Sequence, residues 1–155
     1  MIGIIGAMSA EVEALKAKIE NPRTERISGA EFVSGRLSGK DVVVAQCGIG
    51  KVFAAVCAQT MILRYGATTL INTGVAGTLS DKIGILDFAI SSGVVQHDMD
   101  TTAIGDAPGL ISGINIVEIS AAKSLCETVV STAIEQGNRA IAGAVASGDQ
   151  FINNA

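Results

Sequence analysis

An apolar run broken only by glycine opens the chain at residues 2–8, and a more polar stretch follows it. Ser9 is a residue type that caps helices, Glu11 brings a carboxylate into a first turn, and residues 12–19 place apolar side chains at helical spacing. The pattern predicts a buried strand, a tight loop and a helix. This helix should end before Pro22, because proline disfavours helical geometry in its predecessor, and a surface turn should follow.

A second pattern, in which apolar and polar side chains alternate with period two, occupies residues 31–37. Residues 38–40 have the composition of a turn, and a valine-rich run follows at 41–46. Two such segments joined by a short turn predict an antiparallel β-hairpin. The hairpin makes the predicted sheet a mixed one.

Two longer segments have helical character. Residues 52–65 are apolar on all sides, which predicts a buried helix that ends at Gly66. Residues 121–136 predict another helix, capped by Ser120 and closed by Gly137. The rest of the pattern predicts strands at 69–73, 88–98 and 139–146, and a loop at 101–113.

Three of the predicted strands lead into glycine loops, after Ile5, Gln46 and Ile71. In a doubly wound sheet such loops converge on one crevice at the carboxyl ends of the strands, where ligands bind. Glu11 is therefore the first candidate functional residue, although a carboxylate there also complements the helix dipole. The glycines too have two explanations, a shared ligand site or the steric needs of tight turns, and the pattern does not separate them.

Composition narrows the class of protein. The chain has 155 residues, of which 48% are hydrophobic and 17% charged, as expected of one compact α/β domain. Its net charge is −4 and its basic residues are scattered, so neither nucleic acid nor an anionic membrane surface is an expected partner. No apolar run is long enough to span a bilayer. Cys47, Cys57 and Cys126 are widely spaced, which indicates core thiols in a reducing cytoplasm.

Two local motifs suggest chemistry that their surroundings do not support. Residues 48–51, Gly-Ile-Gly-Lys, open a helix as a phosphate loop does, but Val52 stands where such a loop needs Ser or Thr. His97, Asp98 and Asp100 lack the further ligands of a metal site. A capping or interface role is therefore expected for these three residues.

Five segments in order along the chain resemble those of the 5′-methylthioadenosine/S-adenosylhomocysteine nucleosidases, a family of the purine nucleoside phosphorylase superfamily. They are residues 3–8 with Glu11, 48–52, 72–77, 97–100 and 147–152. The resemblance implies a single domain with a three-layer αβα sandwich fold about a mixed central sheet. It also implies a cytoplasmic homodimer that hydrolyses the N-glycosidic bond of adenine thionucleosides, in methionine salvage and methyl-cycle recycling, without metal or organic cofactor.

The resemblance assigns roles by position. Glu11 would hold and deprotonate the attacking water, Phe151 would stack on adenine, and the backbone of Ile152 would hydrogen-bond the base. Met8 and Ile49 would line the sugar and alkylthio side. The remaining substrate-binding positions would be Val75, Ala76 and Gly77, and Ile104 and Pro108 would lie in the pocket of the neighbouring subunit.

Two positions depart from the family pattern. Val75 stands where many relatives have Ser, so no hydroxyl contact near the ribose is expected from it. Asp106 stands where an aromatic residue is common, which leaves the partner-facing side of the pocket undefined. The preferred thionucleoside, and any acceptance of deoxyadenosine or futalosine-type substrates, are also open.

The resemblance covers the whole chain but only the N-terminal part of a family member. The acid Asp of the family and its ribose-binding Glu would lie beyond Ala155, so the 155-residue polypeptide alone is expected to be nearly inactive. Two alternatives stay open. A phosphorylase of the same superfamily should place Arg residues in the glycine loops, where this chain has none. A truncated, non-catalytic nucleoside-binding fragment is the other.

Overall fold

The computed structural model describes residues 1–153 and divides into two compact units, Met1–Ala76 and the residues from Gly77 onward. Each unit has its own sheet. The single-domain organisation expected from the length remains a prediction.

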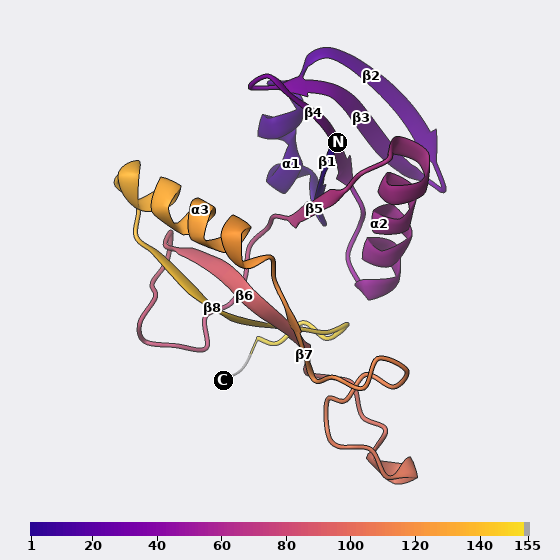
Figure 1. Cartoon of the computed structure of the whole chain (residues 1–155), viewed down its shortest axis with the longest axis vertical. Helices are drawn as coiled ribbons and strands as arrows, with labels where there is room; N and C mark the ends of the chain where they lie inside the picture. The colour runs from indigo at the N-terminus through magenta and orange to yellow at the C-terminus, as the bar shows by residue number, and fades with distance from the viewer. Residues whose placement is uncertain (154–155) are drawn as a thin grey trace. The chain divides into compact units, whose positions relative to one another are not determined.

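The first unit contains a five-stranded mixed sheet in the order β2-β3-β4-β1-β5 (Figure 1). β1 is parallel to both of its neighbours, β4 and β5, whereas β3 is antiparallel to β2 and β4. The predicted hairpin is therefore confirmed as β3 and β4. The strands are β1 (Ile2–Gly6), β2 (Glu20–Ile27), β3 (Ala30–Leu37), β4 (Lys40–Gln46) and β5 (Thr69–Asn72).

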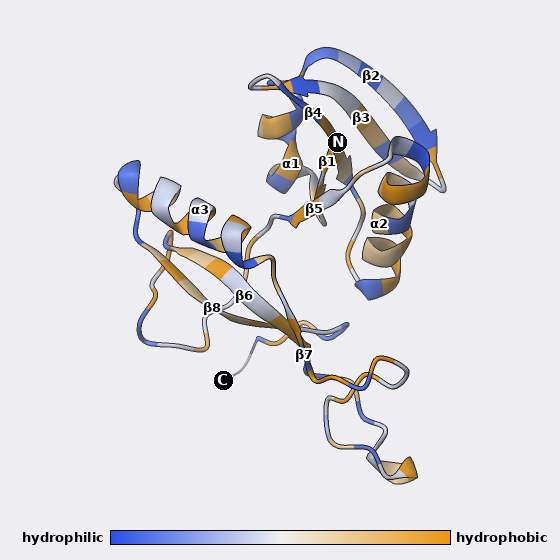
Figure 2. Cartoon of the chain, viewed as in Figure 1, coloured by the Kyte–Doolittle hydropathy of each residue, from blue (hydrophilic) through white to orange (hydrophobic). Residues whose placement is uncertain are grey.

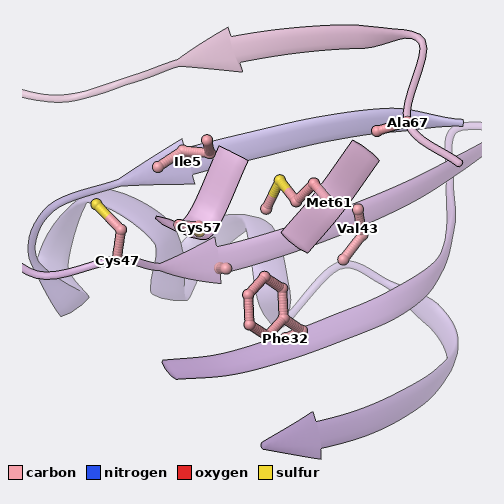
Figure 3. Close-up of a cluster of buried hydrophobic side chains, with 8 residues drawn as sticks. Ile5, Phe32, Val43, Cys47, Cys57, Met61 and Ala67 are labelled. Carbon is pink, nitrogen blue, oxygen red and sulfur yellow. The ribbon is translucent and has the colours of Figure 1, made fainter. Parts of the chain in front are cut away.

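Helices cover both faces of this sheet, α1 (Ser9–Lys16) on one and α2 (Lys51–Tyr65) on the other. Successive side chains of a strand point to opposite faces. Val42 and Val44 of β4 accordingly pack with Val12 of α1, whereas the alternate residues of β4 pack against α2. Figure 3 shows the cluster on the α2 side, which contains Ile5, Phe32, Val43, Ala45, Cys47, Cys57, Met61 and Ala67. The predicted αβα layering is present in this unit.

The segment after α1 differs from the prediction. α1 ends at Lys16 rather than Ile19, and Glu20–Ile27 form β2, where a surface turn was expected. β2 is an edge strand with an exposed, mainly hydrophilic sequence (Figure 2), so it lacks the apolar alternation by which strands are recognised. Pro22 lies at a register shift between Glu20 and Arg23, where its missing N–H is tolerated.

α2 also differs in part. It ends at Gly66 in the left-handed conformation, as predicted, but only Cys57 and Met61 are buried. The opposite side of α2 is apolar and exposed, as Val52 and Leu63 show with 72% and 76% of their surfaces accessible. Because α2 is apolar on all sides, the sequence predicted that all sides of this helix are buried. The sheet buries only one side of it.

The second unit has a three-stranded sheet in the order β7-β6-β8. β6 (Phe88–Gln96) is antiparallel to β7 (Glu118–Ser120) and parallel to β8 (Ala140–Ser147). α3 (Lys123–Glu135) packs against β6 and β8. Between β6 and β7 runs the predicted loop, which contains one 3-10 turn at Thr102–Ile104.

The start of α3 corrects another prediction. Ser120 does not cap this helix, because it pairs with Gly93 as the last residue of β7, and Ala122 occupies the N-cap position. Gly137 adopts a positive φ of 81° just beyond the helix, as expected of the residue that closes it.

The α/β class with mixed sheets is confirmed, but the described strands form two sheets where the prediction had one. The segment between β5 and β6, residues 73–87, contains no strand. Both edges of β6 are hydrogen-bonded to β7 and β8. Among residues 1–153, no helix is long and apolar enough to cross a membrane.

Candidate active site

Three glycine loops meet at one edge of the five-stranded sheet. β1 lies between β4 and β5, parallel to both, with Gly6 opposite Gln46 and Ile5 opposite Asn72. The ladders continue into the loops, since the Cys47 N–H donates to the Gly6 carbonyl at 2.9 Å and Thr73 donates to Ile5 at 2.8 Å. The predicted convergence of these loops is therefore confirmed, at the edge where open α/β sheets bind ligands.

Glu11 lies at this edge, as the third residue of α1 after the N-cap Met8. Its Oε2 accepts a hydrogen bond from the Met8 N–H at 2.9 Å, and its Oε1 accepts one from the Val75 N–H at 3.0 Å. The first bond belongs to ordinary helix capping, in which a carboxylate at this position reaches back to the N-cap amide. The second bond joins α1 to the loop after β5, and a carboxylate that only complements the helix dipole does not need it.

Two glycines make room for Glu11. A Cβ at Gly6 would lie 2.6 Å from a methyl group of Val12 and 3.1 Å from the Cβ of Glu11. A Cβ at Gly74 would lie 2.5 Å from Oε1 of Glu11. The steric explanation of these glycines therefore applies, and the side chain that they admit is the candidate functional residue itself.

The loops that meet near the Glu11 carboxylate carry exposed apolar side chains. Ile49 is 77% exposed and Val75 80% exposed, whereas Met8 is 38% exposed. Cys47, in the loop after β4, is buried, and burial raises the pKa of its thiol. Exposed apolar side chains next to a fixed carboxylate suit a ligand with an apolar portion.

A hollow of about 420 Å³ lies on the α2 side of the first unit, and the glycine loop after β4 borders it. It is bounded by the turn between β2 and β3, by Gln46, Cys47 and Gly48, and by one side of α2. No residue that the sequence predicted for the site lines this hollow.

Phe151 and Ile152 belong to the second unit and follow β8. The carboxyl ends of β6 and β8 are paired, Gln96 opposite Ser147, and the Asp149 N–H donates to Oδ2 of Asp98 at 2.8 Å. The side chain of Phe151 is 94% exposed. Asp98 thus has the capping role that the sequence suggested, and it holds the turn that leads to Phe151.

The loop that carries Ile104 and Pro108 has its own internal support. Oδ2 of Asp106 accepts hydrogen bonds from the hydroxyls of Thr101 and Ser112, at 2.7 and 2.8 Å, which hold the pKa of Asp106 below its usual range. Ile104 and Pro108 are exposed. Asp106 therefore braces this loop from within.

Asp100 has the capping role predicted for it, because its Oδ1 accepts a hydrogen bond from the Thr102 N–H. No cluster of His, Cys, Asp and Glu suited to a metal ion occurs in the part of the chain that the structure describes.

Among the predicted site residues, hydrogen bonds join Glu11 to Met8 and Val75. Ile49 lies in the loop after β4, the strand that pairs with β1. Ala76 ends the first unit, and the other predicted residues belong to the second. Gly74 is not among the predicted site residues, because its only signal in the sequence is its place in a glycine loop after a strand.

Comparison with known proteins identifies the family. The family model of the phosphorylase superfamily matches residues 1–155. A 5′-methylthioadenosine/S-adenosylhomocysteine nucleosidase of Shewanella halifaxensis is 42% identical over 151 residues, which cover 97% of this chain and 66% of that protein.

Solved structures give the same result. The nucleosidase of the same name from Neisseria meningitidis, in complex with methylthio-immucillin-A, matches with a TM-score of 0.92 and 34% identity, covering 97% of this chain and 65% of that one. The enzyme from Colwellia psychrerythraea, in complex with adenine, matches with a TM-score of 0.90 and 37% identity, covering 97% and 62%. The chain thus spans slightly less than two thirds of the length of these relatives. It belongs to the phosphorylase superfamily and, within it, to the sequence family of the 5′-methylthioadenosine/S-adenosylhomocysteine nucleosidases.

Proposed function

We propose that the protein hydrolyses the N-glycosidic bond of 5′-methylthioadenosine and S-adenosylhomocysteine, with Glu11 as the general base. The observation that carries the proposal is the carboxylate of Glu11, fixed by the Met8 and Val75 amides where three glycine loops meet. The relatives' names and the adenine and nucleoside-analogue complexes among them support this choice of substrate.

The chemistry suits a fixed carboxylate. N-glycoside hydrolysis passes through an oxocarbenium-like sugar, and a base must take a proton from the attacking water. The water oxygen bonds to C1′, its proton passes to Glu11, and the C1′–N9 bond breaks with its electron pair going to adenine. A carboxylate has about four lone-pair sites. The two amide hydrogen bonds leave Glu11 able to accept one from the water.

The leaving adenine must also be protonated, and this requires an acid in addition to the base Glu11. The family resemblance assigns this acid to an Asp in the third of the relatives' length that this chain does not span. The base and the acid thus act on opposite sides of the bond that breaks.

The other assignments are part of the same proposal. Phe151 stacks on adenine and the Ile152 backbone bonds its edge, while Met8 and Ile49 contact the sugar and alkylthio group. Val75, Ala76 and Gly77 complete the substrate contacts. We propose further that the protein is a cytoplasmic homodimer, in which the loop with Ile104 and Pro108 completes the neighbouring subunit's pocket, and that it serves methionine salvage.

Replacing Glu11 tests the proposal directly. In the full-length protein, Glu11→Gln keeps the size of the side chain and its amide acceptor but removes the base, so kcat should fall on the order of 10²–10⁴. Adenine affinity should change by less than about twofold, because the base acts on water. The release of adenine from methylthioadenosine measures kcat, and calorimetry measures the affinity for adenine.

Glu13→Gln is the matched control, since Glu13 lies exposed on the same helix without a role in the proposal. Turnover of Glu11→Gln at the parent rate would show that Glu11 is only a helix-end carboxylate.

A phosphorylase is the competing function, and its nucleophile would be phosphate. Three of the five arginines form ion pairs with carboxylates, Arg36 with Asp41, Arg64 with Glu25 and Arg139 with Asp87. None lies in the three glycine loops. Adenine release in phosphate-free buffer is therefore expected, and strict dependence on phosphate would favour the phosphorylase.

A further inference from the structure

We propose that Gly74 and the peptide amide of Val75 position the Glu11 carboxylate, so that Gly74 is required for turnover although it is dispensable for folding. The inference rests on the proposed role of Glu11 as the base. It assigns the orientation of the base to a backbone segment that lies more than sixty residues away in the sequence.

The geometry gives the carboxylate two fixed points. The Met8 N–H, in the loop after β1, holds Oε2 at 2.9 Å, and the Val75 N–H, in the loop after β5, holds Oε1 at 3.0 Å. One amide alone would leave the carboxylate free to rotate about its last bond. Two amides on different loops fix its plane, as a general base needs in order to meet the water at hydrogen-bonding distance.

Gly74 permits the second of these bonds. The three heavy atoms nearest to a Cβ at position 74 all belong to the Glu11 carboxyl group, at 2.5, 3.0 and 3.3 Å. An alanine there would displace Oε1 by roughly 1 Å to reach an ordinary contact distance. A shift of that size in a reacting group can cost on the order of a hundredfold in rate.

The fold itself does not need glycine at this position. Gly74 has no left-handed φ, so alanine adopts its backbone conformation without strain. The atoms that an added methyl group would meet lie at the end of a side chain that can swing away. Alanine also narrows the unfolded ensemble, which offsets part of the loss of the Val75 hydrogen bond, so the melting temperature of Gly74→Ala should stay within about 5 °C of the parent value.

The experiment compares Gly74→Ala with Gly143→Ala in the full-length protein. Nothing lies within 4 Å of a Cβ at Gly143, which also lacks a positive φ and has no place in the proposed site. We expect kcat on methylthioadenosine to fall about ten- to a hundredfold in Gly74→Ala. In Gly143→Ala it should stay at the parent value, and both variants should melt within about 5 °C of the parent.

A second background separates positioning of the carboxylate from a role of Gly74 in the loop. Aspartate at position 11 is one methylene shorter and withdraws its carboxylate from residue 74. Gly74→Ala should therefore cost less than about threefold when it is added to Glu11→Asp. An equal loss in both backgrounds would place the effect in the loop and overturn the proposal.

Hydrogen exchange gives a readout that does not depend on turnover. If the methyl group pushes Oε1 away, the Val75 amide loses its acceptor and should exchange faster in Gly74→Ala, as it should in Glu11→Ala. Unchanged exchange in Gly74→Ala would overturn the proposal even if Glu11→Asp were too slow to assay.

The two proposals fail in different ways. Parent activity in Glu11→Gln would contradict the role of Glu11 and the inference with it. An inactive Glu11→Gln beside a fully active Gly74→Ala would contradict only the role of Gly74.

Discussion

Tyr65 shows how burial and one neighbouring carboxylate act on a single residue. Its hydroxyl donates to Oε2 of Glu25 at 2.9 Å, and its ring stacks on Phe32 with centroids 5.5 Å apart. Burial first, then the hydrogen bond and the charge of Glu25, raise the pKa of Tyr65 to about 12. Arg64 and Tyr65 in turn lower the pKa of Glu25.

The pH dependence of Tyr65 is directly measurable, because it is the only tyrosine in a chain without tryptophan. We expect tyrosinate absorbance to appear near pH 12 in the folded chain and near pH 10 in denaturant. Because the folded pKa is the higher one, stability from the neutral hydroxyl is complete below about pH 10 and is lost as the pH rises toward 12.

Two variants serve as controls for this titration. Tyr65→Phe should remove the signal, and Glu25→Gln should lower the folded midpoint because the negative acceptor is gone. A folded midpoint equal to that in denaturant would contradict the burial and the hydrogen bond together.

At the residue scale, the sequence indicated Glu11 but not what holds it. A carboxylate at the start of a helix after a buried strand is visible as a local pattern. Its hydrogen bond to the Val75 amide is not, because a backbone donor has no residue type and is brought near only by the pairing of β1 with β5. The need for glycine at 74 likewise depends on that pairing.

At the scale of elements, the helices and strands that have a strong local sequence signal were predicted correctly. Those whose place depends on pairing with another strand were not. β3, β4 and the end of α2 at Gly66 were correct, because alternation and a left-handed glycine are local features. β2 was missed, because it forms only by pairing with β3 and its own sequence is polar. Ser120 was assigned to the wrong element for the same reason, since its pairing with Gly93 decides its place.

Another prediction concerns the paired ends of β6 and β8. The His97 N–H donates to the Ser147 carbonyl at 3.0 Å, and Asp98 accepts from the Asp149 N–H, so both strands hold the turn before Phe151. Asp98→Ala removes one of these anchors. We expect adenine affinity in the full-length protein to fall roughly three- to tenfold, as loss of one charge-assisted hydrogen bond allows.

Asp98→Asn is the control for this prediction, since its amide oxygen still accepts a hydrogen bond from Asp149, and its affinity should lie near that of the parent. Calorimetry with adenine measures both. Equal affinities for Asp98→Ala and the parent would show that the turn does not depend on Asp98, or that Phe151 does not contact the base.

At the scale of the whole molecule, the exposed side of α2 is the feature that the sheet leaves unexplained. Its apolar residues are Val52, Phe53, Val56, Ile62 and Leu63. Exposed apolar side chains gathered on one helix are typical of protein interfaces. The proposed homodimer supplies a partner for such a surface, and a twofold interface would bring α2 against the same surface of a second copy.

The last prediction tests that interface. Val52→Lys combined with Leu63→Lys places two charges on side chains that are 72% and 76% exposed within one chain, so folding should be preserved. Within a dimer interface, these charges would be desolvated and would face their own copies. We expect the dissociation constant of the full-length dimer, measured by sedimentation, to rise on the order of a hundredfold or more. Lys40→Glu, at the exposed start of β4, should leave it unchanged. A double variant that remains as tightly dimeric as the parent would exclude this side of α2 from the interface.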